Sequence, residues 1–416
     1  KEFHFSHFDC SNLKANRVNG NQQPLLLGNR HKIIYRQSFS DFKLNIKLLV
    51  ERHRDNNSAL TFEEVFLSIN LNLIQMLEFE YIFLSEFFKI SSDNALNLIK
   101  NLFSETINLF LNTNMEAIEL CGDVTALLIS SNLIRILPTK IYHKIVNKLL
   151  IAYWRELEKL IWFQIKELLS LHITSLKNAR YKSMSVKKAE ISPITRRYGE
   201  FTSSVIFITN TMTFSTLQRD MIRNWFHLSF KNFNNIIINI AEYSFTKNQE
   251  ILAYVYRICN IGMLRNTLRS VCGTDLGQPG FYEVVFVNEM FQNTVEVYSH
   301  FILTESIGYV LKFVDANESI ASPTIPEDIR QKLRDINLKF KNDWDKILKG
   351  LKIKVLSRFS ENDLSRDVMN NVFDSFLNYY HRLHKIVDKI QDETLNPVPM
   401  LHQMILEVKR IKSDMK

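Results

Sequence analysis

The stretch ITRRYGEFTSSVIFIT, residues 194–209, decides the fold class of this chain. Its large apolar residues recur at alternating steps of four and three positions, the spacing that places side chains along one side of an α-helix. The series is Ile194, Tyr198, Phe201, Val205 and Ile208, and it continues to Met212 just beyond the stretch. A seam of this kind packs against neighbouring helices. We therefore expect a helix whose apolar side is buried inside a helical bundle.

Charged residues and a glycine interrupt the same stretch. Arg196 and Glu200 form an i, i+4 pair away from the seam, and Arg197 flanks it. Gly199 costs a helix about 1 kcal/mol relative to alanine, which the close approach of another helix would justify. The stretch therefore has two interpretations: a segment that only packs in the core, or a segment that also binds a partner through Arg196 and Arg197. The seam favours core packing.

The composition extends the helical interpretation to the whole chain. Of 416 residues, 46% are hydrophobic, whereas only 10 are glycine and 8 are proline. β-Sandwiches, barrels and doubly wound folds need many tight turns, which depend on those two residues. Long helices with few connections suit this composition better. We predict an all-α protein, an elongated rod of consecutive helical bundles.

The positive charge is dispersed. The formal net charge is +8, but the 52 basic residues are interleaved with 44 acidic ones. A nucleic-acid binder usually gathers its positive charge on one face, so we expect no nucleic acid. Residues 177–192 are the exception, because they lose helical periodicity and gain basic charge. They predict a basic loop and leave open an alternative function, a helical adaptor that binds anionic membrane or nucleic acid.

The first long helix should begin at a capping box. Thr61 and Glu64 have the spacing at which two side chains satisfy the free N–H groups of a first helical turn. The apolar stripe that follows is too wide for a surface helix and predicts a central one. Its residues are Phe62, Phe66, Ile69, Leu73, Leu77 and Ile82.

Polar residues and a proline predict the next boundaries. A second helix should run to about Leu111, and a third should span about 115–136. The third should end before Pro138, because the residue preceding a proline disfavours helical geometry. Thr139 can then cap a fourth helix.

A cluster of turn residues divides the chain. GTDLGQPG, residues 273–280, predicts a linker. We expect an irregular N-terminal entry segment over 1–58, a helical bundle region over 59–272 that contains the basic loop, and a C-terminal helical bundle over 281–416.

The helix predicted near 361–391 suggests a second partner surface. Phe373, Phe376, Tyr380, Leu383, Val387 and Ile390 recur at steps of three and four and should be buried. The candidate partner-binding residues then lie outward or at the rim of the bundle. They are Tyr379, His381, Arg382, His384 and Lys385. The alternative is a merely solvated helix face.

Motifs for catalysis, cofactors or metals are not evident. Gly273, Gly277 and Gly280 are irregularly spaced and lack the lysine of a P-loop. His381 and His384 could share a metal, but a third ligand is not evident nearby. We expect no enzyme activity, no cofactor and no metal site.

Four segments, in order, resemble the vacuolar protein sorting-associated protein 52 family. The opening stretch is similar to the family's I-T-R-R-Y-A-E-F-S-S run, with Gly199 where alanine is expected. The other three are LLLGNRHKII (25–34), FEEVFLSINLNLIQMLEFEYIFLSEFF (62–88) and YYHRLHKIV (379–387). The chain's last residues, MILEVKRIK (404–412), match a family-like tail. Between 213 and 360 only the helical pattern is recognisable.

The resemblance implies a non-catalytic subunit of the Golgi-associated retrograde protein complex, with helical rods of the tethering-complex type. It implies three sister subunits, contact with a Rab GTPase and with SNARE proteins, and peripheral membrane association through these partners. The implied location is the cytoplasmic face of the trans-Golgi network and of endosomes. The family's N-terminal coiled coil is not recognisable in this chain.

Overall fold

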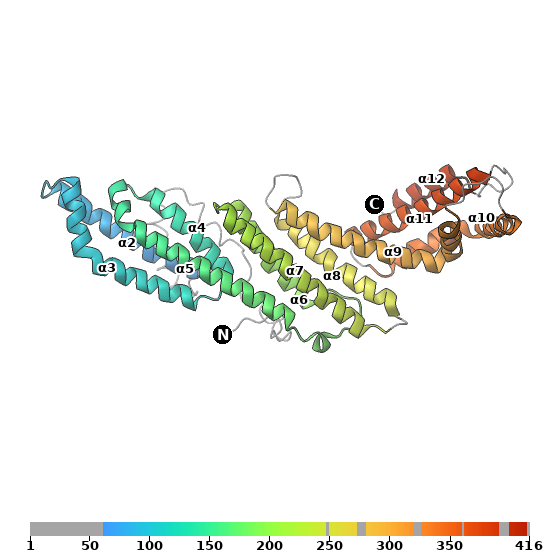
Figure 1. The fold of residues 1–416 in the computed structure, drawn as a ribbon, viewed down its shortest axis with the longest axis horizontal. Helices are drawn as coiled ribbons and strands as arrows, with labels where there is room; N and C mark the ends of the chain where they lie inside the picture. The colour runs from blue at the N-terminus through green and yellow to red at the C-terminus, as the bar shows by residue number, and fades with distance from the viewer. Residues whose placement is uncertain are drawn as a thin grey trace. The chain divides into compact units, whose positions relative to one another are not determined.

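The computed structural model describes residues 61–246, 249–272, 280–318, 326–359, 362–390 and 399–413. These ranges fold into α-helices and one short 3-10 helix and contain no β-strand, which confirms the predicted all-α fold (Figure 1). The predicted entry segment, 1–58, lies outside the described residues. The α-helices are α2 (Phe62–Glu86), α3 (Ser92–Leu120), α4 (Val124–Lys140), α5 (Lys144–Lys177), α6 (Pro193–Thr211), α7 (Thr216–Ser244), α8 (Glu250–Val271), α9 (Phe281–Asn317), α10 (Glu327–Leu356), α11 (Asn362–Ile390) and α12 (Leu401–Ser413).

The chain forms two compact units. The first contains the described residues within Lys1–Arg180, Pro193–Ile236 and Asn266–Val284. The second contains those within Tyr181–Ser192, Ile237–Arg265 and Val285–Lys416. Between α5 and α6, the expected basic loop holds only a 3-10 helix, Tyr181–Met184.

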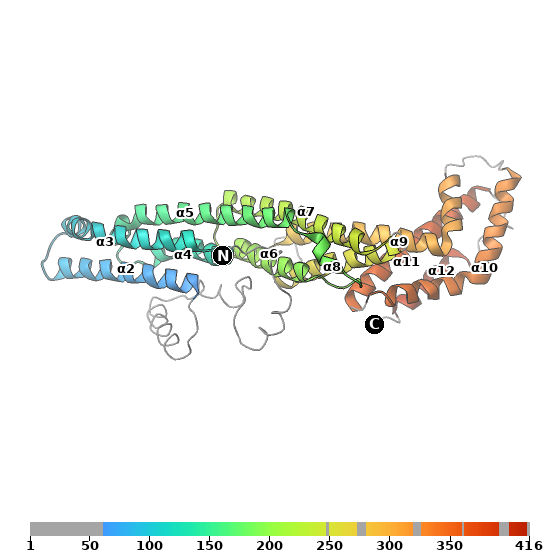
Figure 2. The same cartoon turned by 90° about the horizontal axis from the view of Figure 1, so that it is seen from below.

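In the first unit, α2, α3, α4 and α5 lie side by side (Figure 2). The centre of this bundle is α4, whose residues are buried without a break from Val124 to Ile134. The prediction that α2 is the central helix is therefore wrong, because α2 is exposed along one side. Asp123 begins the helix, since its carboxylate accepts hydrogen bonds from the backbone N–H groups of Thr125 and Ala126. The capping box predicted at Thr61 and Glu64 is present at the start of α2.

A buried polar network fixes the register of three helices in this bundle. Asn70 of α2 donates to Asn114 of α3 at 3.2 Å, and Asn114 donates to Tyr153 Oη of α5 at 3.0 Å. The Tyr153 hydroxyl closes the ring by donating to Asn70 Oδ1 at 2.6 Å. Such a network is stable only when every member is satisfied, so sliding one helix would leave buried polar groups unpaired.

Two predicted helix ends are wrong. α3 continues past Leu111 to Leu120, because the polar residues there are accommodated inside the helix: Thr113 bonds the Leu109 carbonyl and Asn114 joins the network. α4 includes Pro138 and ends at Lys140. The residue before the proline, Leu137, is fully buried, and this burial favours the helical position that a following proline disfavours. Likewise, Thr139 does not cap the next helix, since its hydroxyl donates to the Ile136 carbonyl at 2.7 Å.

The seam of α6 is buried over its whole length, as the sequence predicts. Tyr198 stacks on Phe233 of α7 with ring centroids 4.4 Å apart, and its hydroxyl hydrogen-bonds Ser229 at 2.9 Å. Phe201 packs between the rings of His172 and Trp225. The seam residues Ile194, Tyr198, Phe201, Val205, Ile208 and Met212 are all at most 5% exposed.

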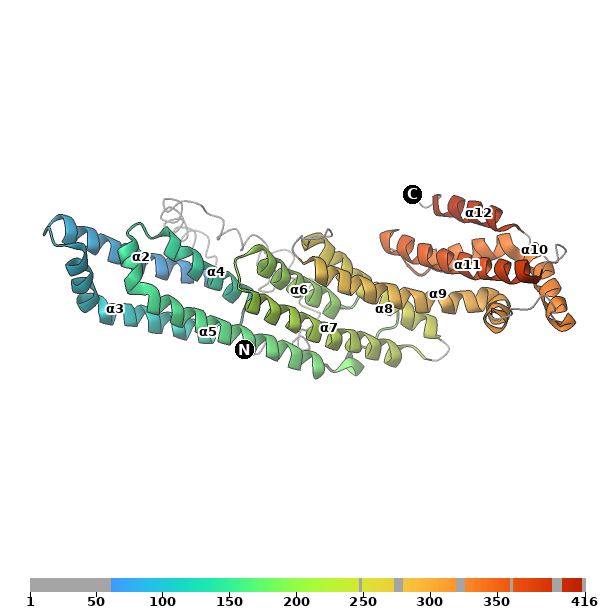
Figure 3. The same ribbon diagram turned by 45° about the horizontal axis from the view of Figure 1, so that its top comes forward.

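In the second unit, α11 packs against α10 and α12 (Figure 3). Gly262 of α8 lets Leu364 of α11 approach closely. Nearby, the buried Arg265 pairs with Asp367 at 2.6 Å and lies 3.9 Å from the centre of the Phe291 ring. The predicted α11 stripe is buried at Phe373, Phe376, Tyr380, Leu383 and Val387. The side chain of Ile390 lies outside the described residues.

Candidate partner-binding surfaces

The two candidate arginines of α6 have different environments. Arg196 is exposed, whereas Arg197 is only 8% exposed and sits beside the seam. Burial raises the pKa of the Glu200 carboxyl, and the positive charges of Arg196 and Arg197 act in the opposite direction. Of the pair, Arg196 is the residue that a partner can reach without a change in the core.

On α11, Arg382 is already held by its own chain. Its guanidinium contacts Asp315 at 2.8 Å and Glu318 at 2.5 Å. It also lies over the Tyr379 ring, 4.8 Å from the centroid. The structure thus brings Tyr379 and Arg382 together, but into a contact with the end of α9. A partner of Arg382 would compete with two carboxylates.

The other three α11 candidates divide by exposure. His381 and Lys385 are exposed, and His384 is half-buried against the Tyr380 ring, at a centroid distance of 5.0 Å. Burial lowers the pKa of His384, and the charge of Asp388 opposes that shift. The neutral form of His384 is therefore favoured, and His381 and Lys385 are the groups open to a partner. Arg196 and Arg197 belong to the first unit, and the α11 candidates belong to the second.

A surface that the sequence analysis missed lies at the end of α2. Phe79, Phe83, Phe87 and Phe88 are 68%, 42%, 70% and 55% exposed, and we call them the phenylalanine cluster. The rings of Phe83, Phe87 and Phe88 contact one another, with centroids between 5.0 and 5.5 Å apart. Exposed apolar patches of this kind mark interaction sites on soluble proteins.

The cluster was missed because α2 is apolar on more than one side. The predicted stripe is buried at Phe66, Leu73 and Leu77, but its last member, Ile82, is 37% exposed. A second series with helical spacing, Phe79, Phe83 and Phe87, was a signal for the other side. Periodicity could not show which of the two sides the bundle covers.

The neighbouring helix α3 also has exposed apolar side chains. Among its 29 residues only Ala95, Ile99, Asn114 and Ile118 are buried. Leu102 and Leu109 are 67% and 64% exposed. A helix with so small a buried side is suited to a further helical neighbour.

The described residues contain no group of three or more His, Cys, Asp or Glu side chains that could hold a metal ion. Among the described helices, none has the length and apolar character needed to cross a membrane.

Two units built from α-helices, with no strand in the described residues, define the class as an all-α helical protein. The chain belongs to the Vps52 family: residues 11–296 match the family model described as "Vps52, C-terminal". This confirms the resemblance seen in the sequence. The candidate partner-binding residues of α11 lie outside the matched residues 11–296.

Relatives from distant organisms agree with the family match. The vacuolar protein sorting-associated protein 52 homolog of Caenorhabditis elegans is 22% identical over 397 residues, which cover 93% of this chain and 54% of that protein. The human homolog is 22% identical over 357 residues, which cover 84% of this chain and 47% of that protein. Vacuolar protein sorting-associated protein 52 A of Arabidopsis thaliana is 22% identical over 340 residues, which cover 79% of this chain and 44% of that protein.

The chain spans about half the length of these curated relatives. No solved structure matches it significantly.

Proposed function

We propose that this chain is part of a non-catalytic subunit of a multisubunit vesicle tethering complex that acts in endosome-to-trans-Golgi retrograde transport. Membership of the Vps52 family supports the proposal, as does the vacuolar protein sorting for which its relatives are named. In this proposal the chain assembles with three other subunits and reaches the cytoplasmic face of the trans-Golgi network and endosomes through its partners.

The observation that carries the proposal is the phenylalanine cluster. Large aromatic side chains that stay in contact with water in one subunit gain free energy when a partner covers them, about 25 cal/mol per Å² of apolar surface. Such anchors commonly dominate the energy of an interface. We assign the phenylalanine cluster and the adjoining side of α3 to a helix of a sister subunit.

The exposed cations provide weaker contacts of a different kind. Arg196, His381 and Lys385 suit acidic surfaces such as those of a Rab GTPase or a SNARE protein. The other candidates contribute less in this proposal, because they are partly or fully buried or are paired within the chain: Arg197, Tyr379, Arg382 and His384. Several weak contacts on one subunit combine through effective concentration, which is how a tether can hold different partners at once.

The test is affinity purification of the tagged protein from cells, followed by mass spectrometry. The wild-type chain should recover three sister subunits. Phe79→Ser combined with Phe87→Ser should reduce that recovery at least about tenfold, as expected for the loss of interface anchors. Leu217→Ser is the matched control, because Leu217 of α7 is 82% exposed and lies outside the cluster.

Recovery of the sister subunits by the double variant at the wild-type level would refute the cluster as the interface. Recovery of none of them by the wild-type chain would refute the proposed function itself. Unchanged thermal melting of the purified variants separates a lost interface from a lost fold.

The basic loop 177–192 supports a second candidate, binding of anionic surfaces. Lys182, Lys187 and Lys188 are all exposed there. Salt-sensitive binding to anionic liposomes or RNA, abolished by changing these lysines to glutamate, together with no recovery of sister subunits, would favour this adaptor function.

A further inference from the structure

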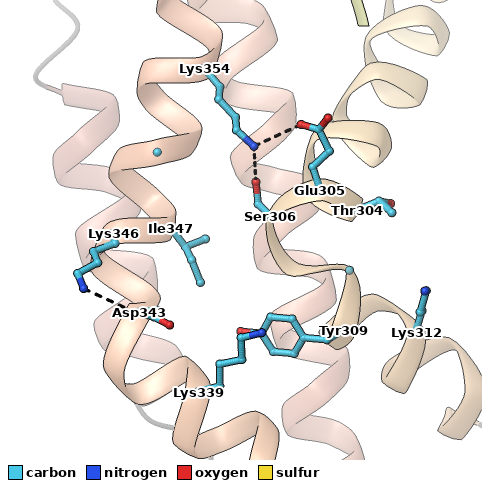
Figure 4. Close-up of a pocket in the computed structure, with 12 residues that line it drawn as sticks. Thr304, Glu305, Ser306, Tyr309, Lys312, Lys339, Asp343, Lys346, Ile347 and Lys354 are labelled. Atoms are coloured by element: carbon cyan, nitrogen blue, oxygen red, sulfur yellow. Dashed lines mark hydrogen bonds and ion pairs between the residues drawn. The ribbon is translucent and has the colours of Figure 1, made fainter. Parts of the chain in front are cut away.

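A charged groove runs between α9 and α10 in the second unit. Its volume is about 560 Å³, within the range of ligand-binding pockets. α9 bends beside the groove, where Ile307 leaves helical geometry with φ −134° and ψ 29°. Tyr309 points from α9 toward α10, and Ile347 points from α10 into the same space (Figure 4).

Two contacts join the helices and leave an opening between them. Lys354 Nζ of α10 lies 3.3 Å from Glu305 Oε2 and 3.2 Å from Ser306 Oγ of α9. Lys339 Nζ of α10 lies 4.3 Å from the centre of the Tyr309 ring. These side-chain contacts link the two helices across the opening.

A glycine keeps the α10 wall of the opening clear. A Cβ built on Gly350 would meet no atom within 4 Å. Glycine inside a helix costs about 1 kcal/mol relative to alanine, and packing does not explain it here. By contrast, a Cβ on Gly262 in the same unit would lie 2.8 Å from Leu364. The absence of a side chain at Gly350 widens the groove without helping the fold.

The groove has unneutralised positive charge. Four lysines and two acids line it: Lys312, Lys339, Lys346, Lys354, Glu305 and Asp343. Lys354 pairs with Glu305, and Lys346 with Asp343 at 3.9 Å. Among the described residues no carboxylate pairs with Lys312 or Lys339. The Tyr309 hydroxyl is buried and lacks a hydrogen-bond partner in the described part of the chain.

We propose that this groove binds an acidic peptide segment of a partner protein. Carboxylates of the peptide pair with Lys312 and Lys339 and accept a hydrogen bond from Tyr309 Oη, while its apolar side chains cover Ile347. A polyphosphorylated lipid headgroup fits less well, because it has no apolar group to cover the Ile347 side chain. The inference goes beyond the proposed function, since it concerns a site apart from the sister-subunit surface.

The test uses fluorescence anisotropy with the full chain and a fluorescein-labelled peptide of alternating glutamate and leucine. Lys312→Glu with Lys339→Glu should weaken binding at least about tenfold by removing two charge pairs. Gly350→Leu should weaken it similarly by filling the groove without changing the charge. Two matched controls, Gly350→Ala and Lys332→Glu with Lys341→Glu, should stay within about threefold of the wild-type affinity.

Lys332 and Lys341 are exposed on α10 and do not line the groove, so the control pair repeats the charge change elsewhere. Three results would each overturn the proposal. They are failure of the wild-type chain to bind the acidic peptide, wild-type affinity of the Gly350→Leu variant, and an equal loss of affinity in the Lys332→Glu, Lys341→Glu control. Phosphoinositide-containing vesicles form a second arm. Groove-dependent binding of those vesicles without binding of the peptide would also overturn it. Far-UV circular dichroism of every variant confirms that its helices are intact.

Discussion

The contact of α6 with α7 and the groove between α9 and α10 show two ways in which this chain places helices side by side. At the first, stacked rings such as Tyr198 and Phe233 close the interface completely. At the second, the Lys354–Glu305 ion pair and the cation–π contact of Lys339 with Tyr309 join the helices on either side of open space. Closed contacts stabilise the fold, whereas the open one costs stability and leaves room for a ligand. Five substitutions test this distinction.

Phe201→Ala should cause the largest loss, about 3–5 kcal/mol of unfolding free energy, because it empties a buried aromatic site. Phe201 is 1% exposed and touches His172 and Trp225. Urea unfolding of both proteins measures the difference. A loss below about 1 kcal/mol would show that the seam is not the closed contact described here.

The pH dependence of stability should reveal the burial of His172. Burial lowers its pKa to about 4, against 6.5 ordinarily, so the unfolded chain takes up the proton first as the pH falls. The contribution of neutral, buried His172 to the free energy of unfolding is complete above about pH 6.5. It falls as the pH is lowered towards 4, and the total loss is up to about 3 kcal/mol.

His172→Phe should remove that slope while preserving an aromatic neighbour for Phe201. Urea midpoints at about pH 7 and about pH 4.5 for both proteins isolate the histidine, because all other groups are shared. Parallel pH profiles for the two proteins would contradict the prediction.

Gly262→Ala should destabilise the second unit by about 1–2 kcal/mol. The added methyl group would lie 2.8 Å from Leu364 and 3.3 Å from Phe291, both of them buried. Overpacking of this kind usually costs more than the helix gains from alanine. Thermal melting is a sufficient measurement, and a more stable variant would mean that α8 and α11 are less closely packed.

Gly350→Ala should have the opposite sign. Since a Cβ at this position meets nothing within 4 Å, the variant should gain up to about 1 kcal/mol of helix stability. Gly350 and Gly262 make a matched pair, identical in chemistry and different only in surroundings. If both substitutions destabilise the protein equally in the same melting experiment, the groove is not open.

Arg196→Ala should have the smallest effect, below about 0.5 kcal/mol, because Arg196 is exposed on α6. Its comparison with Phe201→Ala in urea separates the charged side of α6 from its seam. Equal losses would show that the charged side stabilises this region.

The candidate sites were less predictable than the fold. Sequence spacing placed Arg196, His381 and Lys385 on exposed sides of their helices, but it also grouped Arg382 with them. Arg382 is paired with Asp315 and Glu318, which lie more than sixty positions earlier in the chain. No local pattern links residues so distant, so the pairing could not be predicted. The phenylalanine cluster was visible as a series of residues but not as a surface.

The sequence by itself determined the all-α class, the buried seam of α6, the capping box of α2 and the family. Each of these depends on residues close together in the chain, whose spacing controls helical geometry directly. Tertiary structure alone decided which side of α2 is covered, that α4 continues through Pro138, and that Gly262 is enclosed while Gly350 faces open space. The physical reason is that burial depends on neighbours contributed by other helices, and periodicity contains no information about which helices those are.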